Sequence, residues 1–318
     1  MSLCCVFSCS STTLAYTPLH SKHQRSHEDL LPSRAEFLKS VSLSFAGVAT
    51  GSLVPPLSGD NTHGRFFANA MQTDPKTGIA LPSVGEIESS IPSDWGNVDN
   101  PLEDGDSQTL FSRLDASSDA IFYQDPRFVE HVDENAVNLM TDYISNTAIH
   151  PNDSVLDLCS SWTSHIDTRV VSQLKRVAGL GMNAKELEAN KVLSDWIVQD
   201  LNANPSLSRY PDGSFDVVLC QLSIDYLTRP LEVLKEAGRV LSPGGTIHIL
   251  FSNRLFLSKA VGLWTGKDDI DHAYTVGCYL HFCNGGFEDI RARDLSTRKG
   301  RDGRIVGDPL YVVTATKR

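Results

Sequence analysis

The chain has 318 residues, enough for one large or two small domains, and its hydrophobic content of 41% is ordinary for a globular protein. Its net charge is −11 at pH 7 and it has no basic stripe, which argues against a nucleic-acid partner. The cysteines beyond residue 70 lack C-x-x-C spacing, so we predict no metal site and no disulfide framework; they are Cys159, Cys220, Cys278 and Cys283.

Residues 1–70 have the layout of a cleavable targeting sequence. The motif Ser33–Lys39 (SRAEFLK) precedes an apolar stretch, Val41–Leu57, and small residues at 68–70 supply a cleavage site. The motif resembles a twin-arginine signal with Ala35 in place of the second arginine. We therefore expect a chloroplast protein, in the stroma or, if that signal works, in the thylakoid lumen; a disordered N-terminus is the alternative. Ser, Thr, Gly and Pro interrupt the apolar stretch, so we expect no stable membrane span.

Two further segments precede the main domain. Residues 71–107 mix Pro, Gly, Ser and acidic residues without a period, which favours an extended arm or linker. Residues 108–150 combine aromatic side chains with a helical run, and we expect them to form a helical cap in front of a sheet. The apolar residues of that run recur at three- and four-residue steps: Val132, Ala136, Leu139, Met140 and Tyr143.

Residues 151–318 alternate short apolar runs with helical patterns, which predicts an α/β fold with a doubly wound, mostly parallel sheet. We expect strands at 154–158, 176–182, 196–201, 215–220 and 246–252, with helices between most of them. A helix at 268–282 and closing strands at 287–295 and 310–316 complete the domain.

The segment from Asp212 to Arg254 contains a complete βαβ unit. Phe215–Cys220 is short, apolar and β-branched, as a buried parallel strand should be. Arg229–Val240 has helical spacing, with Pro230 where a first helical turn tolerates proline. A Pro-Gly-Gly turn then ends the helix, and we expect both glycines to accept a positive φ before the next strand.

This segment resembles the class I S-adenosylmethionine (SAM) dependent methyltransferases, in particular the type 11 branch, which share its FD-hydrophobic strand and RVL-x-PGG turn. The similarity extends over roughly 155–316. It implies a Rossmann-like, seven-stranded sheet whose last two strands form an antiparallel edge. It also implies SAM as the cofactor, methyl transfer to a small-molecule or lipid-like acceptor, and an N-terminal addition that covers the cofactor and shapes the acceptor pocket.

The first loop of the domain departs from the family pattern of an acidic residue followed by G-x-G-x-G. Asp157 holds the acidic position, but Cys159, Ser161 and Thr163 replace the glycines. Because a positive φ costs a residue other than glycine about 1–2 kcal/mol, we expect the loop to take a different path. Its hydroxyl and thiol groups can still hydrogen-bond the amino and carboxylate groups of the methionine part of SAM.

The next two strand ends supply further candidates. Gly181 stands where the family offers a carboxylate to the ribose; Asn183 can replace that carboxylate, but capping the following helix is its favoured role. Asp200 matches the acidic position that binds the adenine amino group, or it closes a turn. The predicted cofactor-binding residues are Asp157, Cys159, Ser160, Ser161, Met182, Asn183, Asp200, Leu201, Asn202 and Gln221.

Methyl transfer needs the acceptor atom aligned with the sulfonium, and a general base only where the acceptor is poorly acidic. The candidate bases are His165, His131 and Asp225, with Tyr226 and Tyr123 as orienting groups; a structural role is the alternative for each. The missing glycines also leave open a second function, a non-catalytic methyltransferase-like scaffold or assembly factor in the plastid. The first loop has no G-x-G-x-x-G, which argues against a nicotinamide oxidoreductase. The sequence carries no signal for an oligomeric state.

Overall fold

The computed structural model describes residues 73–74, 81–96, 98, 100–102, 107–301 and 303–318, all within one compact unit, Phe67–Arg318. The predicted targeting sequence, with its cleavage site, lies outside the described residues. Within the described part, no helix is both long enough and apolar enough to cross a membrane.

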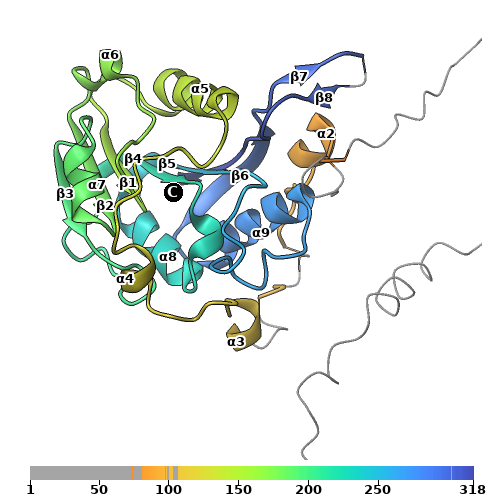
Figure 1. Cartoon of the computed structure of the whole chain (residues 1–318), viewed down its shortest axis with the longest axis horizontal. Coiled ribbons are helices and arrows are strands. Elements are labelled where there is room, and N and C mark those ends of the chain that lie inside the picture. The colour runs from red at the N-terminus through yellow and green to blue at the C-terminus, as the bar shows by residue number, and fades with distance from the viewer. Residues whose placement is uncertain (1–72, 75–80, 97, 99, 103–106, 302) are drawn as a thin grey trace, which may run out of the picture. The chain divides into compact units, whose positions relative to one another are not determined.

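Seven strands form one sheet in the order β3-β2-β1-β4-β5-β9-β6 (Figure 1). The strands are β1 (Ser154–Leu158), β2 (Arg176–Gly181), β3 (Asp195–Val198), β4 (Phe215–Gln221), β5 (Leu241–Phe251), β6 (Phe287–Asp294) and β9 (Tyr311–Lys317). β1 to β5 are parallel, and β9 is antiparallel to both β5 and β6. This arrangement confirms the doubly wound, mostly parallel sheet, whose order reverses between β1 and β4.

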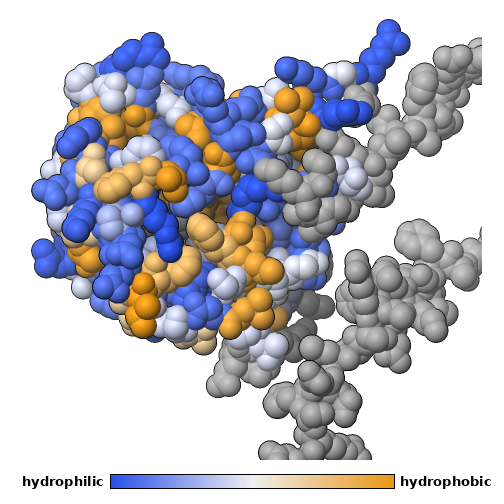
Figure 2. Space-filling view, in the orientation of Figure 1, coloured by the Kyte–Doolittle hydropathy of each residue, from blue (hydrophilic) through white to orange (hydrophobic). Residues whose placement is uncertain are grey.

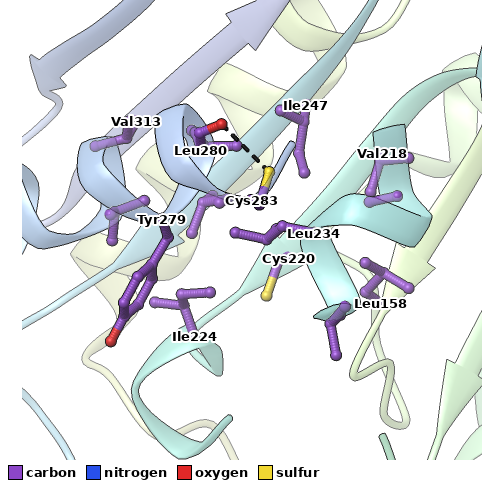
Figure 3. Close-up of a cluster of buried hydrophobic side chains, with 14 of the residues drawn as sticks. Leu158, Val218, Cys220, Ile224, Leu234, Ile247, Tyr279, Leu280, Cys283 and Val313 are labelled. Carbon is purple, nitrogen blue, oxygen red and sulfur yellow. Dashed lines mark hydrogen bonds between the residues drawn. The ribbon is translucent and has the colours of Figure 1, made fainter. Parts of the chain in front are cut away.

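Helices cover both faces of the sheet (Figure 1). On one face lie α8 (Pro230–Val240) and α9 (Asp269–Phe282), which bury Leu234, Tyr279 and Leu280 against sheet residues such as Val218 (Figure 3). On the other face lie α5 (Glu134–Tyr143) and its π-helical continuation Ile144–Ala148, with Met140 and Ile144 fully buried. The sheet is therefore the centre of two apolar cores.

The Pro-Gly-Gly turn, which lies within the first residues of β5, differs in one detail from the sequence prediction. Only Gly244 has a positive φ, +81°. Gly245 is required for a different reason, because a Cβ atom there would lie 2.8 Å from the carbonyl oxygen of Asp216. One glycine thus serves the turn, and the other allows the strands to approach closely.

The segment predicted as an extended arm contains a short helix, α2 (Val84–Glu88), begun by a capping box between Ser83 and Glu86. The predicted helical cap divides between two places. Residues 111–132, which we call the cap segment, contain the short helix α4 (Asp119–Phe122), whereas α5 lies flat on the sheet. Two further short helices are α3 (Ser107–Leu110) and α6 (Thr168–Val171).

Two features of the strands were not predicted. A small hairpin of β7 (Arg298–Lys299) and β8 (Arg304–Ile305) lies between β6 and β9 in the chain. The third strand ends at Val198 rather than Leu201, because Asp200 already closes a turn by accepting hydrogen bonds from the N–H groups of Asn202 and Ala203.

Candidate active site

A cavity of about 390 Å³ lies where the strand order reverses, at the carboxyl ends of β1, β2 and β4. Its size and position are those expected of a ligand site in a doubly wound sheet. The structure brings together there most of the predicted site residues: Asp157, Cys159, Ser160, Ser161, His165, Met182, Asp200, Leu201, Asn202, Gln221, His131 and Tyr226. Asn183 and Asp225 do not line the cavity.

The first loop keeps a left-handed turn at the first of the three substituted glycine positions. Cys159 has a φ of +56°, so the expectation that the loop avoids a positive φ is wrong at this residue. The N–H of Ser160 then donates to the carbonyl of Leu180 at 2.8 Å and draws the loop onto β2. As a result, a Cβ atom on Gly181 would lie 2.0 Å from the Ser160 carbonyl oxygen, and no side chain fits there.

Asp157 anchors a chain of side-chain hydrogen bonds across the cavity floor. Its carboxylate accepts from Ser164 Oγ at 2.6 Å and from Gln221 Nε2 at 2.9 Å. Burial raises the pKa of Asp157, and these two bonds oppose that effect. Through these two hydrogen bonds, Asp157 positions the first loop and the side chain of Gln221.

His165 extends this chain to the cap segment. Its Nδ1 lies 2.8 Å from Gln221 Oε1, and its Nε2 lies 3.1 Å from Glu130 Oε2. Because Gln221 uses its amide nitrogen to donate to Asp157, its oxygen must accept, and the Glu130 carboxylate can only accept. The His165 ring thus lies between two acceptor groups, and its bond to Glu130 holds the pKa of that carboxyl below its usual value. This arrangement suits a positioning role better than that of a general base.

Asn202 and Asn183 both hold backbone in place. Asn202 donates to Asp119 Oδ2 and to the Tyr226 carbonyl, and it accepts from the Thr228 N–H at 2.7 Å. Asn183 caps α7 (Ala184–Ala189) and donates to two carbonyls of the cap segment, as the capping prediction requires. Asn183 therefore has no donor or acceptor left for a ligand, whereas Asn202 keeps one acceptor site on Oδ1.

Glu186 is a cavity residue that sequence reasoning missed. It fits the capping-box pattern, but its side chain leaves α7 and reaches the cavity instead. Oε1 accepts from the Arg127 N–H at 2.6 Å and Oε2 from Ser161 Oγ at 2.7 Å. No local pattern in the sequence could reveal this, because the partners lie 59 and 25 residues away.

The opposite end of the cavity is aromatic. The rings of His131 and Phe256 meet edge to face with centroids 5.1 Å apart. Burial, aided by the charge of Arg127, lowers the pKa of His131, so its imidazole is neutral at pH 7. Burial raises the pKa of both Tyr123 and Tyr226, which are therefore neutral phenols in this wall.

The structure does not support the assignment of Asp225 as a catalytic base in the cavity. The 3-10 turn Ile224–Tyr226 places Tyr226 in the cavity wall and buries Asp225 beneath it. Burial raises the pKa of Asp225 to about 7, and a hydrogen bond from the Tyr226 hydroxyl opposes the shift. Asp225 is a buried acid of the core.

A buried ionic cluster fixes the cap segment over the cavity. Asp119 lies 2.8 Å from Arg113 Nη1 and 3.4 Å from Nζ of Lys259, whose side chain is fully buried. Lys259 also lies 3.0 Å from Asp115. These residues come from two segments far apart in the chain, so no local sequence pattern could predict the cluster.

Comparisons with known proteins agree with this geometry. Residues 161–249 match the family model Methyltransf_11, described as a methyltransferase domain. A ubiquinone/menaquinone biosynthesis C-methyltransferase of Ruegeria sp. is 37% identical over 75 residues, 24% of this chain and 28% of that protein. A demethylmenaquinone methyltransferase of Lysinibacillus sphaericus is 28% identical over 114 residues, 34% of this chain and 48% of that protein. The chain thus spans less than half the length of either relative.

Similar solved structures share little sequence identity with this chain. A SAM-dependent methyltransferase of Methanosarcina mazei is 17% identical, covering 54% of this chain and 94% of that one, with a TM-score of 0.36. A SAM-dependent methyltransferase of Archaeoglobus fulgidus is 16% identical, covering 52% of this chain and 86% of that one, with a TM-score of 0.40.

The family match and this chain's own strand order lead to one assignment. The matched residues run from the first loop through β5, across the cavity and the βαβ unit. They support SAM as the cofactor. Residues 161–249 thus resemble a class I SAM-dependent methyltransferase domain, and the strand order of the sheet is the one expected of that fold.

Proposed function

We propose that this protein transfers a methyl group from SAM to a small-molecule acceptor. The observation that carries the proposal is one cavity with two chemically different ends, a polar end at the first loop and an aromatic end under the cap segment. SAM, when bound, supplies an electrophilic methyl group on a sulfonium. A polar end suits its amino-acid part, and an aromatic end suits an apolar acceptor held against the methyl group.

The residues present fit the cofactor. The hydroxyl-bearing first loop, Ser160 and Ser161, offers hydrogen-bonding groups for the amino acid. Asp200 and Leu201 lie at the third strand's end, where an adenine ring needs one acceptor and an apolar contact. The pocket therefore has polar groups at both extremes of a nucleoside-amino-acid ligand.

The acceptor we propose is an aromatic, lipid-like molecule with an ionisable group. Phe256 and Tyr226 form an apolar wall, and neutral His131 is available to take a proton from the acceptor. Exposed apolar side chains gather on the cap segment and the loop after β5: Leu114, Ile121, Phe128, Val129 and Leu257. Figure 2 shows apolar patches set among hydrophilic surface on the face drawn. The relatives' names, which concern ubiquinone and menaquinone, support a quinone-type ring.

The test is methyl transfer by the purified chain from SAM to a demethylated hydroquinone. His131→Gln should lower kcat by roughly 100-fold while the Kd for SAM stays unchanged, because the proton acceptor is lost and the cofactor end is intact. His150→Gln, at an exposed position, is the matched control and should retain activity. In the wild type, activity should rise with pH as His131 loses its proton. Because the pKa of His131 is lowered, this rise should end at a lower pH than for an ordinary histidine. Full activity in His131→Gln would contradict this role.

A second candidate, a non-catalytic scaffold in the plastid, is favoured by one observation: the Ser160 carbonyl fills the position where the superfamily has its ribose carboxylate. It predicts that a null mutant is rescued by folded Asp157→Ala and Asp200→Ala variants. Loss of rescue would favour the enzyme. We further propose chloroplast localisation, testable by fusing residues 1–70 to a fluorescent protein; cytosolic fluorescence would contradict it.

A further inference from the structure

We infer that Glu186 holds the ribose hydroxyls of the cofactor, in a place and on an element different from the usual carboxylate at the end of the second strand. The inference rests on the proposed function and specifies how this chain compensates for Gly181.

Position 181 itself cannot supply a carboxylate to the ribose. Doubly wound folds use an acidic residue after the second strand to accept hydrogen bonds from a ribose. At Gly181, a Cβ atom would lie 2.0 Å from the carbonyl oxygen of Ser160 and 3.2 Å from a methyl group of Leu187. The first loop therefore occupies the space that a carboxylate would need, and the ribose contact must come from another residue.

The side chain of Asn183 cannot supply the ribose contact either. Asn183 Oδ1 accepts from two backbone N–H groups of α7, at 2.9 and 3.3 Å. Its Nδ2 donates to the carbonyls of Tyr123 and Gln124, at 3.0 and 3.2 Å. All its donors and two acceptor sites are used to join α7 to the cap segment, so Asn183 cannot turn toward a ribose without breaking both contacts.

The carboxylate of Glu186 has the acceptor sites that a ribose needs. Its side chain is 8% exposed and lines the cavity between the first loop and the cap segment. Each carboxylate oxygen accepts one hydrogen bond, from Arg127 N–H and Ser161 Oγ, which are both uncharged groups. A carboxylate has about four acceptor sites, so each oxygen keeps one for a further donor. A vicinal diol supplies two adjacent O–H donors, which match this remaining capacity.

The other carboxylates of the cavity are differently engaged. Asp157 accepts from Ser164 and Gln221, Glu130 pairs with His165, and Asp119 lies in the ionic cluster. Asp200 lies beyond β3, on the adenine side of the proposed cofactor site. Among the described cavity residues, Glu186 is thus the carboxylate next to the blocked ribose position.

The experiment is calorimetric titration of the full chain with S-adenosylhomocysteine and its 2′-deoxy and 3′-deoxy analogues. Wild type should bind each analogue about tenfold more weakly than the parent, the effect of losing one hydrogen bond to a charged group. Glu186→Gln should bind the parent about 100-fold more weakly, a factor of ten for each hydroxyl contact, and should no longer discriminate against the analogues. Glu188→Gln, on the exposed face of the same helix, should behave as wild type.

The use of deoxy analogues separates ribose binding from a merely structural role. If Glu186 only holds the loop and the cap segment, its replacement will weaken all three ligands equally and preserve the discrimination, which overturns the inference. Wild-type binding that ignores both deoxy substitutions overturns it as well, even if Glu186→Gln does not fold. Failure of wild type to bind any of the three sinks the proposed function itself.

Discussion

The βαβ unit Phe215–Phe251 and the first loop, residues 157–165, are neighbours because β1, which leads into the loop, pairs with β4, but they are specified in opposite ways. In the unit, burial follows the spacing of apolar residues, and helix, turn and strand occur in the predicted order. In the loop, Cys159 and His165 both take a positive φ and Ser160 lies against Gly181. A core follows from local pattern, whereas a site follows from contacts between distant segments.

The largest expected loss of stability comes from a substitution in the core of the βαβ unit. Leu234 on α8 is 1% exposed and packs between sheet and α9 (Figure 3). Leu234→Ala should lower the free energy of unfolding by about 3 kcal/mol through lost burial and a cavity. Urea unfolding measures it, with exposed Lys235→Ala as the control. A loss below about 1 kcal/mol would mean that this core relaxes around the change.

The next test asks whether the loop contact is as tight as the structure has it. Gly181→Ala should cost about 2–3 kcal/mol because its methyl group meets the Ser160 backbone. Gly85→Ala, in α2 with nothing within 4 Å of the added Cβ, should stabilise the protein slightly. Thermal unfolding compares the two variants. Equal stability would contradict the close approach of the loop to β2.

The buried carboxyl group of Asp225 sharpens the comparison through the pH dependence of stability. Asp225 has a folded-state pKa of about 7, above its unfolded value, so the folded state holds the proton more tightly and stability falls from about pH 4 to pH 7. Asp225→Asn should remove the cost of burying the ionised carboxyl group. The free energy of unfolding should therefore rise by on the order of 2 kcal/mol at pH 8, and by less at pH 5. Urea unfolding at both pH values measures the gain. A gain that does not depend on pH would contradict the raised pKa.

The smallest effect concerns strain in the loop. Cys159→Gly should relieve the cost of a φ of +56° and stabilise the protein by about 1 kcal/mol relative to Cys159→Ala, which keeps it. Both variants lose the thiol, so their difference isolates the backbone term. If alanine is as stable as glycine here, the left-handed turn is not strained.

Sequence reasoning found the sheet because apolar runs such as Phe215–Cys220 report burial directly. It also gathered most of the cavity, since strand ends of a parallel sheet meet at one edge. It placed Asp225 in the cavity because the sequence does not reveal the 3-10 turn, which turns Tyr226 toward the cavity and Asp225 into the core. It missed Glu186, Glu130 and the Lys259 cluster, because each depends on a contact between the cap segment and a distant part of the chain.

The central claim is that a first loop without glycine still builds a SAM site. The most direct measurement is calorimetric titration of the full chain with SAM. We predict saturable binding of one SAM per chain, weakened by Asp200→Ala but not by exposed Asp212→Ala. Absence of binding by folded protein at about 1 mM SAM, a concentration that detects even a Kd near 1 mM, would contradict the account.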